Sequence, residues 1–254
     1  MRTMTPKRAI VREPGDNYRL CISSHPQRHT VDVKKARTQH AVYCRTLSDL
    51  GLDIIRLPRD DQHPDSCFVE DNAVVHGGRA LICRMAKESR RGEESDVEKV
   101  LAEYLTVRWA ESPATVEGGD VIHLGDRLIS GITQRTNKAG VEQMRAWLQV
   151  EVGTIEDASI VHLKSYVNCL GEGLVISTAK YADHPLLKDL EILTVPDDDW
   201  YSTNNIVIED TVIMPAGFPR TERLVGEAGF RVIPLEMTEY PKCEGALTCL
   251  SMIF

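Results

Sequence analysis

Short apolar runs separated by tight polar turns recur along the chain and predict β-hairpins. In each hairpin an apolar run is followed by a glycine or polar turn and then by a second apolar run, which is the pattern of two antiparallel strands. The segments are AVVHGGRALIC from Ala73, DVIHLGDRLIS from Asp120, YVNCLGEGLVIS from Tyr166 and NIVIEDTVIMP from Asn205. Their similar length and spacing indicate a repeated structural unit.

Helical patterns and further strand-like stretches lie between these hairpins. Helices are expected over residues 32–50, 137–149 and 220–228, and Gly229 is placed to end the last of them. The strand-like stretches LDIIRLP and FRVIPLEM come after helical patterns. Spacing of i, i+3, i+4, i+7 and i+8 predicts another amphipathic helix, which includes Val97, Val100, Leu101, Tyr104 and Leu105.

The recurring unit is therefore two strands, a helix and a strand, with a period of about 40 to 50 residues, which is typical of repeat architectures. Strands near residues 9–11 and 247–253 can form a fifth unit from both ends of the chain. Closing a ring in this way removes exposed sheet edges. The sequence predicts one α/β domain over residues 1–254, a closed five-bladed propeller of ββαβ repeats with pseudo-five-fold symmetry. A doubly wound sheet is disfavoured because its glycine-rich phosphate loop is not found.

Composition narrows the classes of partner. The chain has 254 residues, of which 42% are hydrophobic and 27% charged, enough apolar surface for one sizeable core. The formal net charge of -8 leaves no basic excess for nucleic acid and favours a small cation instead. No apolar run approaches the roughly 20 residues that cross a bilayer, so no membrane partner is expected. A cytoplasmic location is expected.

Seven cysteines form no CxxC pair and no regular disulfide framework. Their odd number favours free thiols in a reducing compartment. A buried apolar role is the default for each of them. Cys44 in particular continues the apolar stripe of the helix over 32–50, and the same stripe places His40 in the core.

Four chemically active residues occupy equivalent places in the repeat. Asp71, Glu117 and His162 each stand at the start of a repeat's first strand, about 45 residues apart, and Cys249 follows about two periods later. Equivalent positions of a closed repeat point toward its axis, so these side chains are expected to converge. A thiol to attack, an imidazole to move protons and a carboxylate to orient it are what nucleophilic catalysis needs.

Each of these residues has a simpler interpretation. Cys249 could be a buried strand cysteine and His162 a structural imidazole. Glu117 beside two glycines, and Asp71 beside Asn72, could be polar turn residues. Arg90 could belong to a solvated charge cluster. The other histidines show no metal-ligand spacing with the cysteines, and no metal site is predicted.

Several sequence strings favour the catalytic interpretation. They are PDSCFVEDNAVV from Pro64, ESRRGE from Glu88, TVEGGD from Thr115, RTN from Arg135, HLK from His162, MPAGFPRT from Met214 and GALTCLS from Gly245. Together, and in this order, they closely resemble the dimethylarginine dimethylaminohydrolase family. The resemblance implies the guanidine-modifying superfamily, with its five-bladed pentein propeller. It also implies hydrolysis of asymmetric dimethylarginine or monomethylarginine to citrulline and the corresponding amine, without metal or organic cofactor.

The resemblance also implies roles for the catalytic residues. Cys249 would be the nucleophile, His162 the general acid and base, and Glu117 the third catalytic residue. Carboxylates such as Asp71 and Glu117 could hold the planar guanidinium by charge-assisted hydrogen bonds.

The remaining implied roles concern the rest of the substrate, a small guanidino amino acid. Arg90 and Arg135 would bind its α-carboxylate, and Asp65 its α-ammonium group. Glu70 would support the site beside Asp71. Cys21 falls where the family has an apolar, substrate-contacting loop residue, so recognition of the methyl groups is left open.

Two other functions remain as alternatives. The first is deimination of free arginine or another small guanidino compound, on the same fold and with the same thiol chemistry. The second is non-catalytic binding, as in the ribosome anti-association factor, which has a related five-fold architecture without a catalytic triad. The sequence leaves the oligomeric state open, with a homodimer as one candidate.

Overall fold

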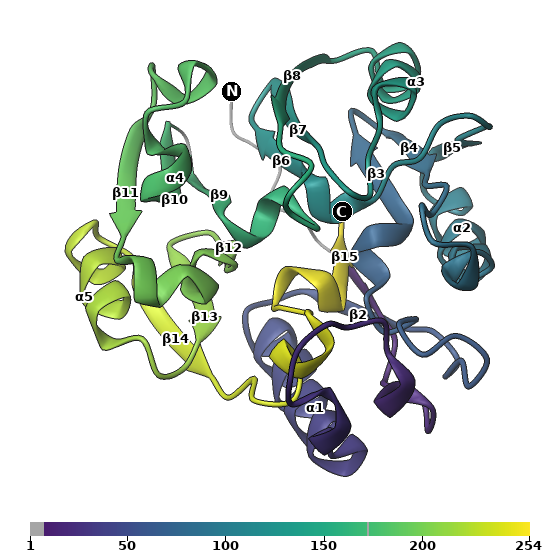
Figure 1. Cartoon of the computed structure of the whole chain (residues 1–254), viewed down its shortest axis with the longest axis horizontal. Helices are drawn as coiled ribbons and strands as arrows, with labels where there is room; N and C mark the ends of the chain where they lie inside the picture. The colour runs from purple at the N-terminus through teal and green to yellow at the C-terminus, as the bar shows by residue number, and fades with distance from the viewer. Residues whose placement is uncertain (1–7, 172) are drawn as a thin grey trace.

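The computed structural model describes residues 8–171 and 173–254. These residues form five three-stranded sheets that lie around a common centre (Figure 1). In each sheet the middle strand pairs antiparallel with one neighbour and parallel with the other. The predicted unit of a hairpin, a helix and a returning strand is thus confirmed. Glu172, in the turn predicted within YVNCLGEGLVIS, lies outside the described residues.

Four of the sheets are each formed by one continuous stretch of chain. Their strands are β3 (Ala73–His76), β4 (Arg79–Ile82) and β5 (Thr106–Trp109); β6 (Val121–Leu124), β7 (Arg127–Ile132) and β8 (Glu151–Glu156); β9 (Val167–Gly171), β10 (Leu174–Thr178) and β11 (Glu191–Val195); β12 (Ile206–Ile208), β13 (Thr211–Pro215) and β14 (Arg231–Leu235). The first strand β9 contacts the first strands of two neighbouring sheets, β6 and β12.

The fifth sheet joins the two ends of the chain. Strand β1 (Arg8–Val11) lies between β15 (Ser251–Ile253) and β2 (Asp53–Arg56), with Ala9 opposite Ile253 in antiparallel register and opposite Ile54 in parallel register. The prediction that both chain ends supply one unit is therefore confirmed.

Helices lie toward the outside of the five sheets (Figure 1). They are α1 (Val33–Asp49), α2 (Glu94–Ala102), α3 (Lys138–Leu148), the short α4 (Ala179–Ala182) and α5 (Pro219–Glu227). Asp32 caps α1 by accepting a hydrogen bond from the Lys35 amide at 3.0 Å. The helix predicted to reach Leu105 ends at Ala102 instead, because β5 begins at Thr106 and the intervening residues connect the two elements.

The interior of the domain is apolar, as the sequence predicts. His40 and Cys44 are both buried in it, and burial lowers the pKa of His40 to about 4, so its ring is neutral. None of the helices within residues 8–171 and 173–254 is long and apolar enough to cross a membrane.

The prediction that all cysteines are free thiols is wrong for two of them. Cys21 and Cys243 form a disulfide across a sequence separation of 222 residues. Within residues 8–171 and 173–254 the other five cysteines are free. Nothing in the spacing of the two residues indicates this bond, because the fold alone brings them together.

A short 3₁₀ helix precedes the first strand of every sheet. These turns span Val69–Asn72, Gly118–Asp120, Leu163–Ser165, Asp197–Thr203 and Thr248–Leu250. Each turn contacts the next, from Thr248–Leu250 through Val69–Asn72, Gly118–Asp120 and Leu163–Ser165 to Asp197–Thr203. The equivalent positions singled out in the sequence therefore meet near the centre of the fold.

Candidate active site

The central turns bring the three predicted catalytic residues, Glu117, His162 and Cys249, together with Asp71. Asp71 and Cys249 lie within two of these turns, while Glu117 and His162 immediately precede two others. The Nε2 atom of His162 lies 2.9 Å from Oε2 of Glu117 and 3.7 Å from Oδ1 of Asp71. Cys249, His162 and Asp71 line one cavity of about 20 Å³, which has room for about one water molecule.

His162 is held in its cationic form by its neighbours. Burial alone would lower the pKa of its imidazole, but the negative charge of Asp71, the hydrogen bond to Glu117 and the charge of Asp120 together raise that pKa to about 9. At neutral pH the ring therefore carries two N–H donors and can release a proton to a bound group.

Glu117 is the anionic partner of that ring. It has no exposed surface, and its Oε1 accepts a hydrogen bond from the Ala86 amide at 3.1 Å. Burial would raise its pKa, but His162, Arg90 and Arg135 outweigh burial and lower the pKa to about 2. Glu117 therefore remains a carboxylate and orients the imidazole.

Gly119 explains why the TVEGGD string needs a glycine beside these groups. A Cβ atom on Gly119 would lie 2.7 Å from Nδ1 of His162 and 2.9 Å from Oδ1 of Asp71. Its amide donates a hydrogen bond to the same Asp71 oxygen at 3.1 Å. No larger residue fits without moving the imidazole.

The thiol of Cys249 is protonated in the resting site. Burial raises its pKa well above the ordinary value, and the carboxylates of Asp71 and Glu70 raise it further. The thiol therefore needs a positive charge nearby before it becomes a nucleophilic thiolate.

Arg90 lies in the cavity wall, where buried carboxylates already bind it. Its Nη1 donates to Oδ2 of Asp71 at 2.9 Å, and its Nε and Nη2 donate to the carboxylate of Glu93 at 2.8 to 3.2 Å. Glu93 belongs to the ESRRGE string, but the sequence analysis assigns it no role. Its spacing of three residues from Arg90, on one turn, is the signal that could have indicated this ion pair. Arg90 is a buried, paired cation, so the predicted alternative of a solvated charge cluster is wrong for it.

Arg135 differs from Arg90 because donors of its guanidinium group are unused. Among the residues that the structure describes, its Nε and Nη1 atoms are buried without a hydrogen-bond partner, and the nearest carboxylate oxygen, Oε1 of Glu117, is 3.9 Å from Nη1. Unpaired buried donors are costly. A group in the cavity that accepts hydrogen bonds would satisfy them.

Asp65 and the loop after Cys21 form another part of the wall. Both carboxylate oxygens of Asp65 accept from the Ile22 amide, at 3.3 and 3.1 Å. Ile22, Cys243 and Glu244 line the cavity, whereas Cys21 is not among its lining residues. The structure therefore places Ile22, rather than Cys21, where a loop residue could contact a ligand.

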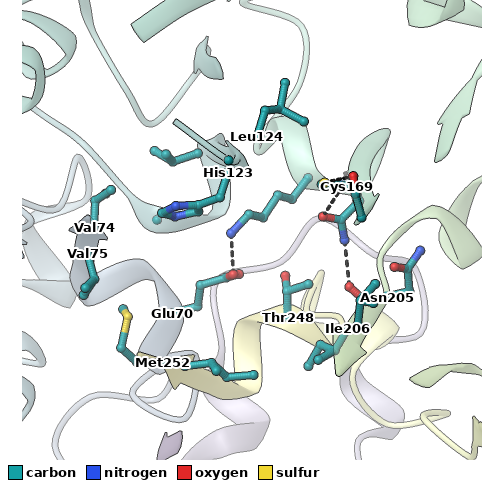
Figure 2. A pocket seen from close by; sticks show the side chains of 18 of the residues that line it. Glu70, Val74, Val75, His123, Leu124, Cys169, Asn205, Ile206, Thr248 and Met252 are labelled. Atoms are coloured by element: carbon teal, nitrogen blue, oxygen red, sulfur yellow. Dashed lines mark hydrogen bonds and ion pairs between the residues drawn. The ribbon is translucent and has the colours of Figure 1, made fainter. Parts of the chain in front are cut away.

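Glu70 faces away from this cavity. It lines a second, larger cavity of about 780 Å³ (Figure 2). Its Oε1 lies 2.5 Å from Nζ of Lys164. Two of the central turns lie between the cavities, and adjacent residues in each turn line different cavities. Glu70 and Thr248 line the larger cavity, whereas their neighbours Asp71 and Cys249 line the smaller one. Glu70 and Lys164 thus form an ion pair in the larger cavity, and the supporting role expected of Glu70 stays a prediction.

Asn204 is a residue that the sequence analysis missed. Its Oδ1 accepts from the Thr248 amide at 2.9 Å, and its Nδ2 donates to Oγ1 of Thr248 at 3.0 Å. Asn204, which directly follows the fifth central turn, therefore fixes Thr248, the residue before Cys249. Its position just before β12 was the available signal.

Asp71, Glu117 and His162 are the one group in the described part of the chain with ligand atoms close enough to hold a metal ion, all within 4.8 Å of one another. Their oxygens already accept from the cations Arg90 and His162. The same three residues therefore suit an ion-paired acid–base site.

Comparisons with known proteins agree with this arrangement. A family model described as eukaryotic N,N dimethylarginine dimethylhydrolase matches residues 16–189. The N(G),N(G)-dimethylarginine dimethylaminohydrolase of Pseudomonas aeruginosa is 35% identical over 88% of this chain and 90% of its own. The protein of that name from Streptomyces coelicolor is 35% identical over 98% of this chain and 97% of its own.

A solved structure of a dimethylarginine dimethylaminohydrolase also matches this chain. A variant of the Pseudomonas aeruginosa dimethylarginine dimethylaminohydrolase in which serine replaces a cysteine, complexed with citrulline, is 33% identical to this chain. It covers 99% of this chain and 100% of its own, with a TM-score of 0.94. The chain therefore belongs to the dimethylarginine dimethylaminohydrolase family of hydrolases.

Proposed function

We propose that this protein hydrolyses free asymmetric dimethylarginine or monomethylarginine to citrulline and dimethylamine or methylamine. The observation that carries the proposal is the convergence of Cys249, His162 and Asp71 on one small cavity, with the carboxylate of Glu117 2.9 Å from the imidazole. A thiol nucleophile, a proton donor and a carboxylate are the groups that displacement of an amine from a guanidinium carbon requires.

The substrate is oriented by charge at both ends. Asp71 accepts hydrogen bonds from the guanidinium group and places its central carbon beside Cys249, because a planar fork of donors matches a carboxylate. At the amino-acid end, the unused donors of Arg135 bind the α-carboxylate and Asp65 accepts from the α-ammonium group. Holding both ends lowers the entropic part of the barrier.

The substrate itself activates the nucleophile. A guanidinium cation next to Cys249 opposes the effect of Asp71 and Glu70 and lowers the pKa of the thiol. The thiolate therefore forms when a cationic substrate is present.

Two displacement steps complete the reaction. In the first, the sulfur of Cys249 bonds to the guanidinium carbon, and the bond to the methylated nitrogen breaks as His162 gives that nitrogen a proton. In the second, water loses a proton to the neutral imidazole and attacks the S-alkylthiouronium carbon, and the carbon–sulfur bond breaks to release citrulline. One water is consumed. The thiol loses its proton to solvent when the substrate binds, and the departing thiolate regains one from the new hydroxyl group of the intermediate. Both the thiol and the imidazole therefore return to their starting states.

A direct assay tests this function. We would incubate the protein separately with arginine, monomethylarginine and asymmetric dimethylarginine, and measure citrulline, ammonia, methylamine and dimethylamine. The expected result is citrulline together with the methylated amine in equal amounts. Citrulline and ammonia from arginine, with no reaction of the methylated substrates, would establish a deiminase instead. Absence of citrulline from all three would contradict both functions.

Replacing Arg135 tests the carboxylate contact. We expect Arg135→Ala to raise KM for methylated arginine about 10- to 150-fold, the equivalent of losing roughly 1.5 to 3 kcal/mol from a charge-assisted hydrogen bond. KM for an analogue without the carboxylate should change much less. Equal rises for both substrates would show that Arg135 does not bind the carboxylate.

Arg90→Ala provides the contrast for Arg135. Removal of Arg90 leaves the carboxylates of Asp71 and Glu93 buried without their cation. An uncompensated buried charge of this kind typically costs about 3 to 5 kcal/mol of stability. Thermal unfolding of both variants would therefore separate the binding role of Arg135 from the additional structural role of Arg90.

The pH profile tests the proton donor. Because the pKa of His162 is raised to about 9, its imidazolium form predominates below that pH, and kcat for methylated arginine should fall as pH rises through about 9. The substrate's α-ammonium group also titrates in the alkaline range. A His162→Gly variant acting on a substrate with an activated leaving group separates the two. A fall that persists unchanged in that variant would belong to the substrate and contradict the assignment.

We further infer that the five sheets close into a five-bladed α/β propeller of the pentein type. Support comes from the pairing of β1 with β15, which joins the chain ends, and from the contacts between successive central turns. A closed ring is also what directs side chains from several turns to one axis.

A further inference from the structure

The disulfide between Cys21 and Cys243 lies at the wall of the candidate active site. Each cysteine is next to a residue that lines the cavity, because Cys21 precedes Ile22 and Cys243 precedes Glu244, and Cys243 itself lines the cavity. The bond therefore joins two segments that are distant in sequence and that both line the cavity together with Asp65.

Hydrogen bonds join the same two segments around the disulfide. The amide and the hydroxyl of Ser24 both donate to Oε1 of Glu244, at 2.7 and 2.6 Å. Oγ of Ser23 donates to the Lys242 carbonyl at 2.8 Å. These polar contacts are partly or fully exposed to water, where each contributes little. The disulfide is the one covalent link between the segments.

The wall must move for a substrate to bind. A cavity of about 20 Å³ cannot hold an amino acid, and the Ile22 amide lies against the Asp65 carboxylate that faces the cavity. With Cys21 anchored to Cys243, residues after Cys21 can move away and return to one position. Without that anchor, the loop would have to be ordered each time a substrate binds, at an entropic cost.

We propose that the Cys21–Cys243 disulfide is a positioning element for substrate binding, which holds Ile22 and Glu244 in fixed positions relative to Asp65. Affinity for the guanidino amino acid then depends on whether Cys21 and Cys243 are oxidised to the disulfide. This inference rests on the proposed function for the identity of the substrate. A dithiol reductant breaks the sulfur–sulfur bond by supplying two electrons and two protons, which yields two cysteine thiols and the cyclic disulfide of the reductant. Cys249 is chemically unchanged by this step.

The first test establishes the bond itself. Alkylation of the denatured, unreduced protein should modify five cysteines, and prior reduction should raise this number to seven. Mass spectrometry of the unreduced digest should find the peptides of Cys21 and Cys243 joined. Seven alkylated cysteines without reduction, in protein purified under air, would overturn the proposal.

The second test separates positioning from chemistry. In the double variant Cys21→Ala/Cys243→Ala we expect KM for methylated arginine to rise roughly 3- to 30-fold, the effect of ordering a few additional loop side chains on binding, with kcat within about twofold of wild type. Cys169→Ala is the matched control, because it removes a free thiol on β9 that is not among the residues lining the small cavity. An unchanged KM, or equal losses in both constants, would contradict a positioning role.

A third measurement does not depend on turnover. Loosening the wall should make Cys249 react faster with iodoacetamide in the double variant than in the oxidised wild type, with Cys169→Ala at the wild-type rate. Ser24→Ala, which removes an exposed contact and leaves the disulfide intact, should increase the rate less. If methylated arginine is not a substrate at all, this alkylation rate still tests the wall, so failure of the proposed function and failure of this inference are distinguishable. Equal rates in all variants would overturn it.

Discussion

Cys249→Ser should abolish turnover of methylated arginine while leaving the fold intact. A serine hydroxyl has about the size of the thiol but does not ionise under the influence of a nearby guanidinium, so no nucleophile forms. Loss of a covalent nucleophile typically lowers kcat on the order of 10⁴-fold or more. Initial rates and thermal unfolding of the two proteins, compared side by side, would measure both parts of the expectation.

The same assignment predicts a covalent intermediate on Cys249. Acid quenching of the wild-type protein during turnover should trap a mass increase on the peptide that contains Cys249. Cys67 is the competing thiol, because it is buried and comes from the same acidic segment as Asp65. Cys169→Ser, a change at a free thiol of the larger cavity, is the control and should react normally. An adduct on Cys67, or undiminished turnover in Cys249→Ser, would refute the assignment.

Local patterns account for the part of the fold that the sequence predicted. The hairpins, and the helices that became α1, α3 and α5, depend on spacing within about 20 residues, which periodicity reports directly. The end of α2 was misjudged because Tyr104 and Leu105 continue the apolar spacing into the connection to β5. Periodicity records which residues are apolar but does not record where the chain must turn.

The candidate site was predictable to the extent that it follows from the repeat. Asp71, Glu117, His162 and Cys249 converge because they occupy equivalent positions in or beside the central turns. The disulfide was missed because it depends on the approach of segments 222 residues apart.

The direction in which individual side chains point could not be predicted from the sequence either. Glu70 and Asp71 are adjacent in sequence, yet they face different cavities. Arg90 and Arg135 share a residue type and an implied role. Only the three-dimensional arrangement shows that Glu93 binds the first, while donors of the second are unused.

His162→Gly should slow amine release about 10²- to 10⁴-fold, the usual contribution of a positioned general acid or base. The imidazole is assigned two tasks, protonation of the leaving amine and then activation of water, and the variant removes both. A substrate whose leaving group needs little protonation, such as a thiol, should restore only the first task. Because the second task would remain unassisted, the S-alkylthiouronium adduct should accumulate on Cys249.

Two measurements distinguish this outcome from simple damage to the site. The activated substrate should give a burst of leaving group equal to the enzyme concentration, followed by very slow turnover, with the adduct visible by mass spectrometry. Glu117→Gln is the matched variant, because it keeps the imidazole but removes the anion 2.9 Å from it. The pKa of His162 should therefore fall, and the alkaline limb of the pH profile should move to lower pH. If His162→Gly turned over methylated arginine at nearly the wild-type rate, proton transfer by this residue would be excluded even though the family and the fold would stand. A burst confined to the activated substrate would instead show that the thiol of Cys249 attacks without help from the imidazole, because the incoming guanidinium alone lowers its pKa enough.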